Sequence, residues 1–200
     1  MALLLSVLEQ GMIYGILALG VYITYKILDF PDLTVDGSFP FGAAITVRLI
    51  NGFGVPAILT LPIAFLGGAL VGICTGLIHV KLKVRDLLSG IIMMTGLYTI
   101  NLWVAGSGYV AIFDKENIFN NSFVNSITSG FLVNFKNVII IFLITMVAKY
   151  LLDWYMSTKS GFLLRAVGDN DTIVTSLGVD KGLVKIVGLS IANGLVSLSG

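Results

Sequence analysis

Residues 55–78 read VPAILTLPIAFLGGALVGICTGLI and contain no charged side chain. A bilayer core needs about 20 consecutive apolar residues for one helical crossing, so this stretch is long enough to span a membrane. Gly68, Gly72 and Gly76 recur four residues apart and fall on one face of such a helix. A row of small residues favours close packing of a second helix in lipid, although glycine is also generally common in membrane helices.

The rest of the chain has the same apolar character. Hydrophobic residues make up 56% and charged residues 12%, and the mean hydropathy is +0.98, whereas a soluble domain is about half apolar and a quarter charged. Further helices are expected at residues 3–23, 87–104 and 135–152 and from residue 183 onward; the first carries Gly11 and Gly15. We therefore expect an all-α, polytopic transmembrane bundle of about six helices in one domain over residues 1–200. The last apolar stretch continues to Gly200, so we expect a fragment of a longer domain.

A polar break, ILDFPDLTVDGS at residues 27–38, precedes a shorter apolar stretch at 39–50 that is too short to cross alone. Non-helical backbone and ionisable groups persist at membrane depth only inside protein or along a cavity. Thr34, Asp36 and Ser38 are thus candidates for a translocation path, with Asp36 able to meet a solute ammonium. The alternative is an interfacial turn whose aspartates face water. Thr95 and Asn101 on a later helix are candidates for the same path or for helix packing.

The basic residues indicate how the chain is oriented. If residues 79–86 are cytoplasmic, nine basic residues fall inside and three fall outside, which agrees with the positive-inside rule. This topology puts the N-terminus outside, provided that residues 39–50 complete a crossing. The inside residues are Lys26, Lys81, Lys83, Arg85, Lys149, Lys159, Arg165, Lys181 and Lys185, and the outside ones are Arg48, Lys115 and Lys136.

Residues 159–185, KSGFLLRAVGDNDTIVTSLGVDKGLVK, form the longest segment expected in the cytoplasm. Asp169, Asn170 and Asp171 are good helix N-caps, and Gly178 is a natural residue for ending a helix. These signals predict a short amphipathic helix at 172–177, and Asp180 is expected to cap the next helix. Such a segment is either a docking element for a soluble partner or a solvated connector.

This segment resembles the cytoplasmic coupling segment of the ABC importer permeases of the branched-chain amino acid type, whose pattern is roughly G-x-x-x-R-A-x-G-x-N-x-x-x-A-x-x-x-G-I. Two positions depart from the pattern, with Val174 in place of alanine and Val179 in place of isoleucine. Residues 10–39 resemble a subgroup of these permeases associated with lipoprotein-type binding proteins and, in some members, aromatic amino acids. The matching residues are Gly161, Arg165, Ala166, Gly168, Asn170 and Gly178, and Asp169 lies among them.

The resemblance implies a multi-pass permease of the bacterial plasma membrane that moves a small solute, an aromatic or branched-chain amino acid. It implies three protein partners: a cytoplasmic ATP-binding subunit docked on the coupling helix, a second permease copy, and an extracytoplasmic solute-binding lipoprotein. Membrane lipids surround such a protein. An ion-coupled secondary transporter is the alternative, because a broken helix with a carboxylate also suits ion coupling.

Other classes of function lack the residues they need. The chain has one histidine and one cysteine, Cys74, so it offers no metal cluster, catalytic triad or intrachain disulfide. No GxxxxGK[ST] motif is present, so nucleotide must bind to another subunit. A net charge of +1 gives no basic surface for nucleic acid. We expect neither an enzyme nor a bound cofactor.

Overall fold

The computed structural model describes residues 2–106, 135–176 and 178–200. These residues form eight α-helices and one π-helical turn, η1, and contain no strand. The elements are α1 (Ala2–Tyr22), η1 (Ile23–Ile27), α2 (Val35–Phe53), α3 (Ala57–Leu82), α4 (Asp86–Ala105), α6 (Lys136–Met156), α7 (Lys159–Asp169), α8 (Asp171–Ser176) and α9 (Lys181–Ser199). The expected all-α fold is confirmed. Most of the polar segment between α4 and α6 lies outside the described residues.

Five helical spans among the described residues are long and apolar enough to cross a membrane. They are α1 with η1, α3, α4, α6 and α9. The sixth long helix, α2, carries Asp36 and Arg48 and is less apolar. It begins at Val35 and not at residue 39, because the N–H groups of Gly37 and Ser38 donate to the carbonyl of Thr34 at 2.9 Å. Its 19 residues give a length of about 28 Å, close to a bilayer core, so the expectation of a short second segment was wrong.

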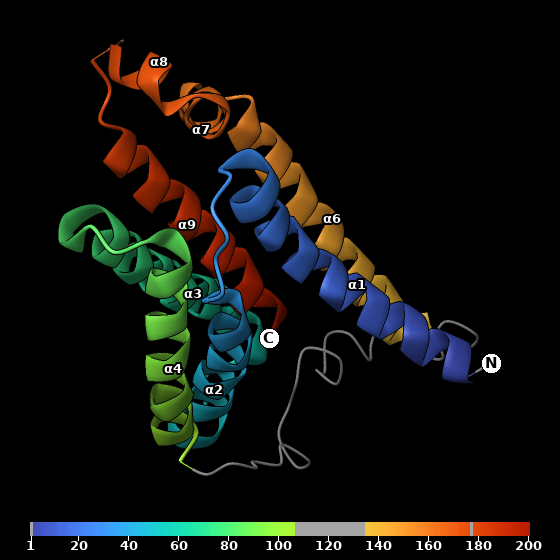
Figure 1. Ribbon diagram of the computed structural model, residues 1–200. Coiled ribbons are helices and arrows are strands. Elements are labelled where there is room, and N and C mark those ends of the chain that lie inside the picture. The colour runs from blue at the N-terminus through green and yellow to red at the C-terminus, as the bar shows by residue number, and fades with distance from the viewer. Residues whose placement is uncertain (1, 107–134, 177) are drawn as a thin grey trace.

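Helix α9 lies at the centre of the bundle and packs along α3 (Figure 1). The glycine row of α3 faces α9: a Cβ at Gly72 would lie 2.6 Å from the carbonyl carbon of Leu189, and one at Gly68 would overlap the backbone of Asn193. A Cβ at Gly76 would lie 2.9 Å from the side chain of Ile186. The two helices therefore touch backbone to backbone, which maximises packing contacts where lipid supplies no hydrophobic drive between helices.

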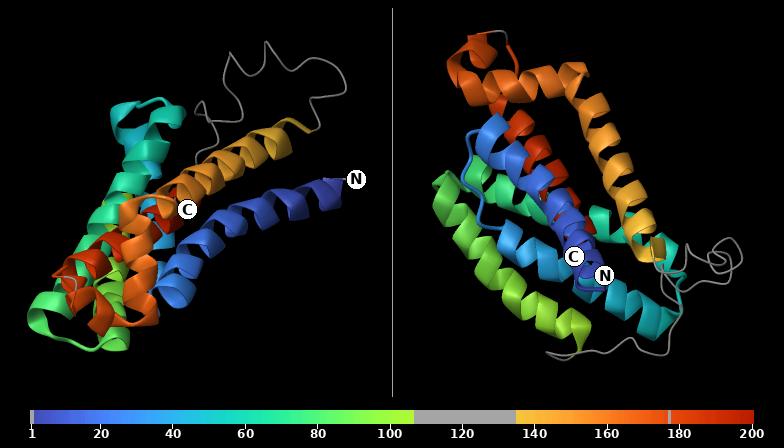
Figure 2. Two further views of the ribbon diagram at one scale, coloured as in Figure 1. Left: turned by 90° about the horizontal axis from the view of Figure 1, so that it is seen from above. Right: turned by 90° about the vertical axis from the view of Figure 1, so that its right-hand side faces the viewer.

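The remaining long helices flank this central pair. Helix α1 runs beside α6, and α2 runs beside α4 (Figures 1 and 2). Only 11% of the apolar window of α1 is buried, against 50% for α9. The outward faces of the flanking helices are apolar, so they are suited to lipid or to another membrane protein and not to water. A cleft of about 610 Å³ between α3, α6 and α9 is also apolar.

One end of the bundle gathers η1, the α3–α4 turn, the platform formed by α7 and α8, and the start of α9 (Figures 1 and 2). These elements carry most of the basic residues expected in the cytoplasm. Arg48 lies in the last two turns of α2, and Lys136 is the first residue of α6; both are at the other end of the bundle. Lys115 lies outside the described residues. The distribution of charge along the bundle thus follows the expected orientation.

Candidate functional site

Helix α7 lies across the end of the bundle and is amphipathic. Leu164 and Val167 are buried on its inner face. Phe162, Arg165 and Asp169 are exposed, and their spacing places them together on the outer face. The α7–α8 platform therefore presents an aromatic, a cationic and an anionic side chain away from the membrane helices.

The sequence prediction for this segment needs correction. Arg165, Ala166, Gly168 and Asp169 were expected in a connector before a single docking helix, but they lie within α7. Gly161 and Gly168 also lie within α7, and neither has a positive φ. Glycine lowers intrinsic helix propensity, so the two glycines of this segment argued against a helix there. Tertiary packing overrides that propensity here.

Gly168 allows α7 to lie directly on the end of the first membrane helix. A Cβ at Gly168 would overlap the carbonyl oxygen of Ile27 in η1. Beside it, the fully buried Leu164 covers Gly188 of α9, where a Cβ would lie 2.5 Å from Leu164 Cδ1 and 3.3 Å from Leu28 Cδ2. Because packed interiors transmit strain, a force on α7 acts directly on η1 and α9.

Of the capping predictions in this region, those for Asn170, Gly178 and Asp180 are confirmed, whereas Asp169 and Asp171 lie within α7 and α8. Asn170 Oδ1 accepts a hydrogen bond of 3.1 Å from the N–H of Thr172 at the start of α8. Gly178 has a φ of +76° shortly after α8 ends. Asp180 Oδ1 accepts from the N–H of Gly182 at 2.8 Å and so caps α9. Helix α8 corresponds closely to the short helix expected at residues 172–177.

A buried polar network lies deeper in the bundle, around the polar break. Asp32 is 1% exposed; its Oδ1 accepts from the N–H of Thr34 and its Oδ2 from Asn193 Nδ2, both at 2.8 Å. Ser38 Oγ donates to Asn193 Oδ1 at 2.6 Å, and the hydroxyls of Thr34 and Thr75 lie 3.1 Å apart. Among the described residues no cation pairs with Asp32. The network ties the break to α2, α3 and α9.

The middle of the break, at Asp32, therefore lies inside protein. Asp29, Asp32 and Asp36 have different surroundings, because Asp32 is buried whereas the other two are exposed. Gly90 of α4 allows that helix to approach the break: a Cβ there would lie 2.8 Å from the backbone nitrogen of Leu33. Non-helical backbone is thus covered by protein, as membrane depth requires.

We expect Asp32→Asn to lower the thermal stability of the protein. The amide NH₂ cannot accept a hydrogen bond, so it must face the Thr34 N–H or Asn193 Nδ2, and a buried donor left unpaired costs about 1–3 kcal/mol. Asp29→Asn is the matched control because Asp29 is exposed and asparagine tolerates its φ of +50°. Thermal unfolding in detergent measures both; equal melting temperatures would contradict a structural network.

A separate pocket of about 270 Å³ lies between α2 and α4; its lining is mostly apolar and includes a few polar groups. Asn101 Nδ2 donates to the carbonyl of Gly37 at 3.1 Å, whereas its Oδ1 is buried and has no partner among the described residues. Asp36 is exposed at the same pocket. Carboxylate and amide oxygens are acceptors only, so the pocket is suited to a cationic donor such as an ammonium. Its lining residues are Asp36, Gly37, Pro40, Met94, Thr95, Tyr98 and Asn101.

The structure brings together only part of the expected path. Asp36, Thr95 and Asn101 line the α2–α4 pocket, while Thr34 and Ser38 are fully buried in the network around Asp32. Within the described part of the chain, no three histidine, cysteine, aspartate or glutamate side chains gather to hold a metal ion.

Asp32 and Asn193 were not predicted to be partners. Asn193 stands alone as an amide in the apolar stretch of α9, and a lone polar residue in a membrane helix usually has a bonding partner. That signal was available. Which aspartate it meets depends on how α9 lies against the break.

Five apolar helical spans, a buried polar break and a helical platform at one end define a multi-pass membrane protein. A family model described as the permease component of branched-chain amino acid transport systems matches residues 3–200. The chain belongs to this family and is a multi-pass protein of the plasma membrane.

Curated relatives agree with the family match. The chain is 41% identical over 198 residues to a tyrosine transport system permease protein of Clostridioides difficile. The aligned residues cover 98% of this chain and 62% of the relative. It is 30% identical to an uncharacterized protein of Rickettsia prowazekii, covering 100% of this chain and 67% of that protein.

A more distant relative is a probable branched-chain amino acid transport permease protein of Methanocaldococcus jannaschii. The two are 26% identical over 97% of this chain and 64% of the relative. The chain thus spans about three fifths to two thirds of the length of these relatives. No solved structure matches the chain.

Proposed function

We propose that this chain is a transmembrane permease domain that forms the path for a small solute in an importer driven by ATP hydrolysis on a separate subunit. The solute is an amino acid, aromatic or branched-chain. Family membership and the relative named for tyrosine transport support this proposal. The importer also contains a second permease copy and an extracytoplasmic solute-binding lipoprotein.

The observation that carries the proposal is the α7–α8 platform. Its outer face bears Phe162 and Arg165, residue types enriched at interface hot spots. Its inner face rests on η1 and α9 through Gly168 and Leu164. A subunit that docks on the outer face thereby gains a short mechanical connection to two membrane-embedded elements. An ion-coupled transporter has no need for such a docking surface.

Reconstitution tests the energy source. The permease, its ATP-binding subunit and its binding protein are placed in proteoliposomes, and uptake of labelled tyrosine, leucine and valine is measured. Uptake is expected to require ATP and to persist when ionophores dissipate the ion gradients. Uptake that needs no ATP and stops with ionophore would overturn the proposal in favour of ion coupling.

The α2–α4 pocket is proposed to receive the ammonium of the amino acid. Asp36 supplies the opposite charge, and the unpartnered Asn101 Oδ1 supplies a second acceptor. Tyr98 and Met94 give the pocket an apolar side that suits a hydrophobic amino acid side chain. If water leaves the pocket when the path closes, the attraction between the Asp36 carboxylate and the solute ammonium becomes stronger, because the local dielectric falls.

Asp36→Asn is expected to lower uptake about fivefold, because a hydrogen bond to a charged group is worth about 1 kcal/mol more than a neutral one. Folding should be unaffected, since Asp36 is exposed and has no ion-pair partner among the described residues. Transport kinetics in the reconstituted system measure the effect. Asp29→Asn, the same change at an exposed site outside the pocket, is the control. Equal uptake by the two variants would remove Asp36 from the path.

A further inference from the structure

Another pocket, of about 470 Å³, lies at the platform end of the bundle between the α3–α4 turn and the start of α9. Its charged side chains are Lys83, Arg85, Asp86, Asp180, Lys181 and Lys185. Cations outnumber carboxylates, and each carboxylate has a partner nearby. Asp180 Oδ1 accepts from the N–H of Gly182, and Asp86 Oδ1 lies 3.6 Å from His79 Nδ1.

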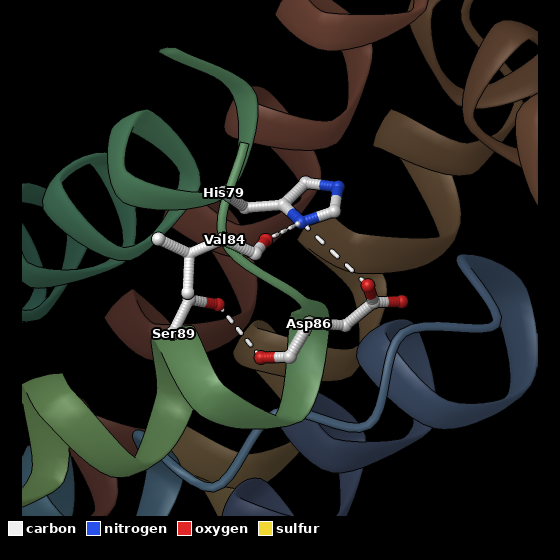
Figure 3. A network of polar contacts seen from close by, with 4 residues as sticks. All are labelled: His79, Val84, Asp86 and Ser89. Atoms are coloured by element: carbon white, nitrogen blue, oxygen red, sulfur yellow. Dashed lines mark hydrogen bonds and ion pairs between the residues drawn. The ribbon is translucent and has the colours of Figure 1, made fainter. Parts of the chain in front are cut away.

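The turn that forms one wall is held in a fixed shape (Figure 3). His79 Nδ1 lies 2.9 Å from the carbonyl oxygen of Val84, and the His79 ring meets Phe30 edge to face at 5.0 Å. Ser89 Oγ donates to the carbonyl of Asp86 at 2.7 Å. Both neighbours of Nδ1 are acceptors, so this nitrogen carries the hydrogen. The positions of Lys83 and Arg85 are therefore set by a rigid turn.

Lys83 occupies a position where glycine would be expected. It ends α3 with a φ of +55°, a left-handed conformation that glycine adopts freely and residues with side chains rarely adopt. Strained residues of this kind cluster at ligand sites. Within the described part of the chain, no carboxylate pairs with Lys83, Arg85 or Lys185. Four cationic side chains and two carboxylates thus line one pocket, which leaves it with a net positive charge.

Two exposed leucines stand next in the sequence to residues that line the pocket. Leu82, next to Lys83, is 71% exposed, and Leu183, on the first turn of α9, is 61% exposed. A ligand that suits both surfaces has an anionic head and an apolar tail. A soluble acidic protein surface would match the cations but would leave the leucines exposed.

We propose that this pocket binds the phosphate headgroup of an anionic phospholipid in the cytoplasmic leaflet, with its acyl chains along Leu82 and Leu183. Basic pockets between membrane helices on the cytoplasmic side are known to take such headgroups. The pocket volume falls within the range of ligand sites. The bound lipid would hold the α3–α4 turn against the start of α9, beside the platform.

The test uses the full-length permease in nanodiscs or detergent, with bound lipid counted by native mass spectrometry. Phosphatidylglycerol is expected to remain bound, and phosphatidylcholine is not. Each lost cation should weaken phosphatidylglycerol binding about fivefold. The variants are Lys83→Gly, which relieves the positive φ and so keeps the fold, and Lys185→Gln. Lys159→Gln, on the platform and outside the pocket, is the matched control.

Three results would overturn the proposal. Phosphatidylglycerol binding that is unchanged in both variants would show that the pocket is not the site. Full displacement of the lipid by inorganic phosphate at equal concentration would show that the site takes free phosphate. Loss of ATP-binding subunit association in Lys83→Gly with unchanged lipid binding would assign the pocket to a protein partner.

Discussion

Replacing Phe162 with alanine and Arg165 with glutamate together should abolish co-purification of the ATP-binding subunit while the permease stays folded in the membrane. Both side chains point away from the bundle, so the change leaves the packing of Leu164 and Val167 intact. Truncating an aromatic hot spot costs about 2 kcal/mol or more, and reversing a charge adds repulsion, so affinity should fall at least about thirtyfold.

The measurement is pull-down of the ATP-binding subunit by tagged permease, followed by ATP-driven uptake. Arg48→Glu is the control, because it is the same reversal at an exposed arginine on the opposite end of the molecule. The double variant is a sharper test than a flexible linker across residues 165–170, which would also remove the buried Val167. Undiminished association of the double variant would refute the docking function of α7.

The second large effect is expected in Gly72→Ala. The added Cβ would lie 2.6 Å from the carbonyl carbon of Leu189 and 2.7 Å from Cα of Ser190, both backbone atoms of α9. Backbone cannot yield as a side-chain tip can, so α3 and α9 must move apart along the central contact of the bundle. Overpacking of this kind costs about 1–3 kcal/mol. Thermal unfolding in detergent should show a melting temperature several degrees lower.

Gly15→Ala provides the matched control for this variant. Gly15 lies in α1, and a Cβ there would meet no atom of the described residues within 4 Å. Alanine has the higher helix propensity, so the control should match or exceed the parent protein in stability. A Gly72→Ala protein as stable as Gly15→Ala would mean that α3 and α9 lie farther apart than the structure shows.

The platform shows how local signals can be right while an element is missed. Asn170, Gly178 and Asp180 were read correctly as helix boundaries, because capping depends on side chains within a few residues of one another. Helix α7 was not predicted, because Gly161 and Gly168 weaken its local propensity. The contact of Gly168 with Ile27 joins residues far apart in sequence and gives no local signal.

The polar break shows the same limit for the candidate site. Its composition indicated polar groups held inside a membrane protein, and that is where the structure places Asp32 and Thr34. The choice among Asp29, Asp32 and Asp36 could not be made from composition, because all three lie in the same short segment. Asp32 is the buried one because Asn193 donates to it and Gly90 lets α4 pack closely against the break. Asp36 instead lines a pocket together with Asn101.

The order of the amino acids is enough to identify a multi-helical membrane protein with a capped segment at one end, because hydrophobicity, charge bias and capping act over one helix or less. The glycines that bring helices together, in contrast, are identified only in the folded bundle. Gly11 and Gly15 repeat the spacing of Gly68 and Gly72, yet a Cβ would fit freely at the first pair and would collide with α9 at the second. Spacing places small residues on one face of a helix, but the helix that meets that face is chosen by the packing of the whole bundle.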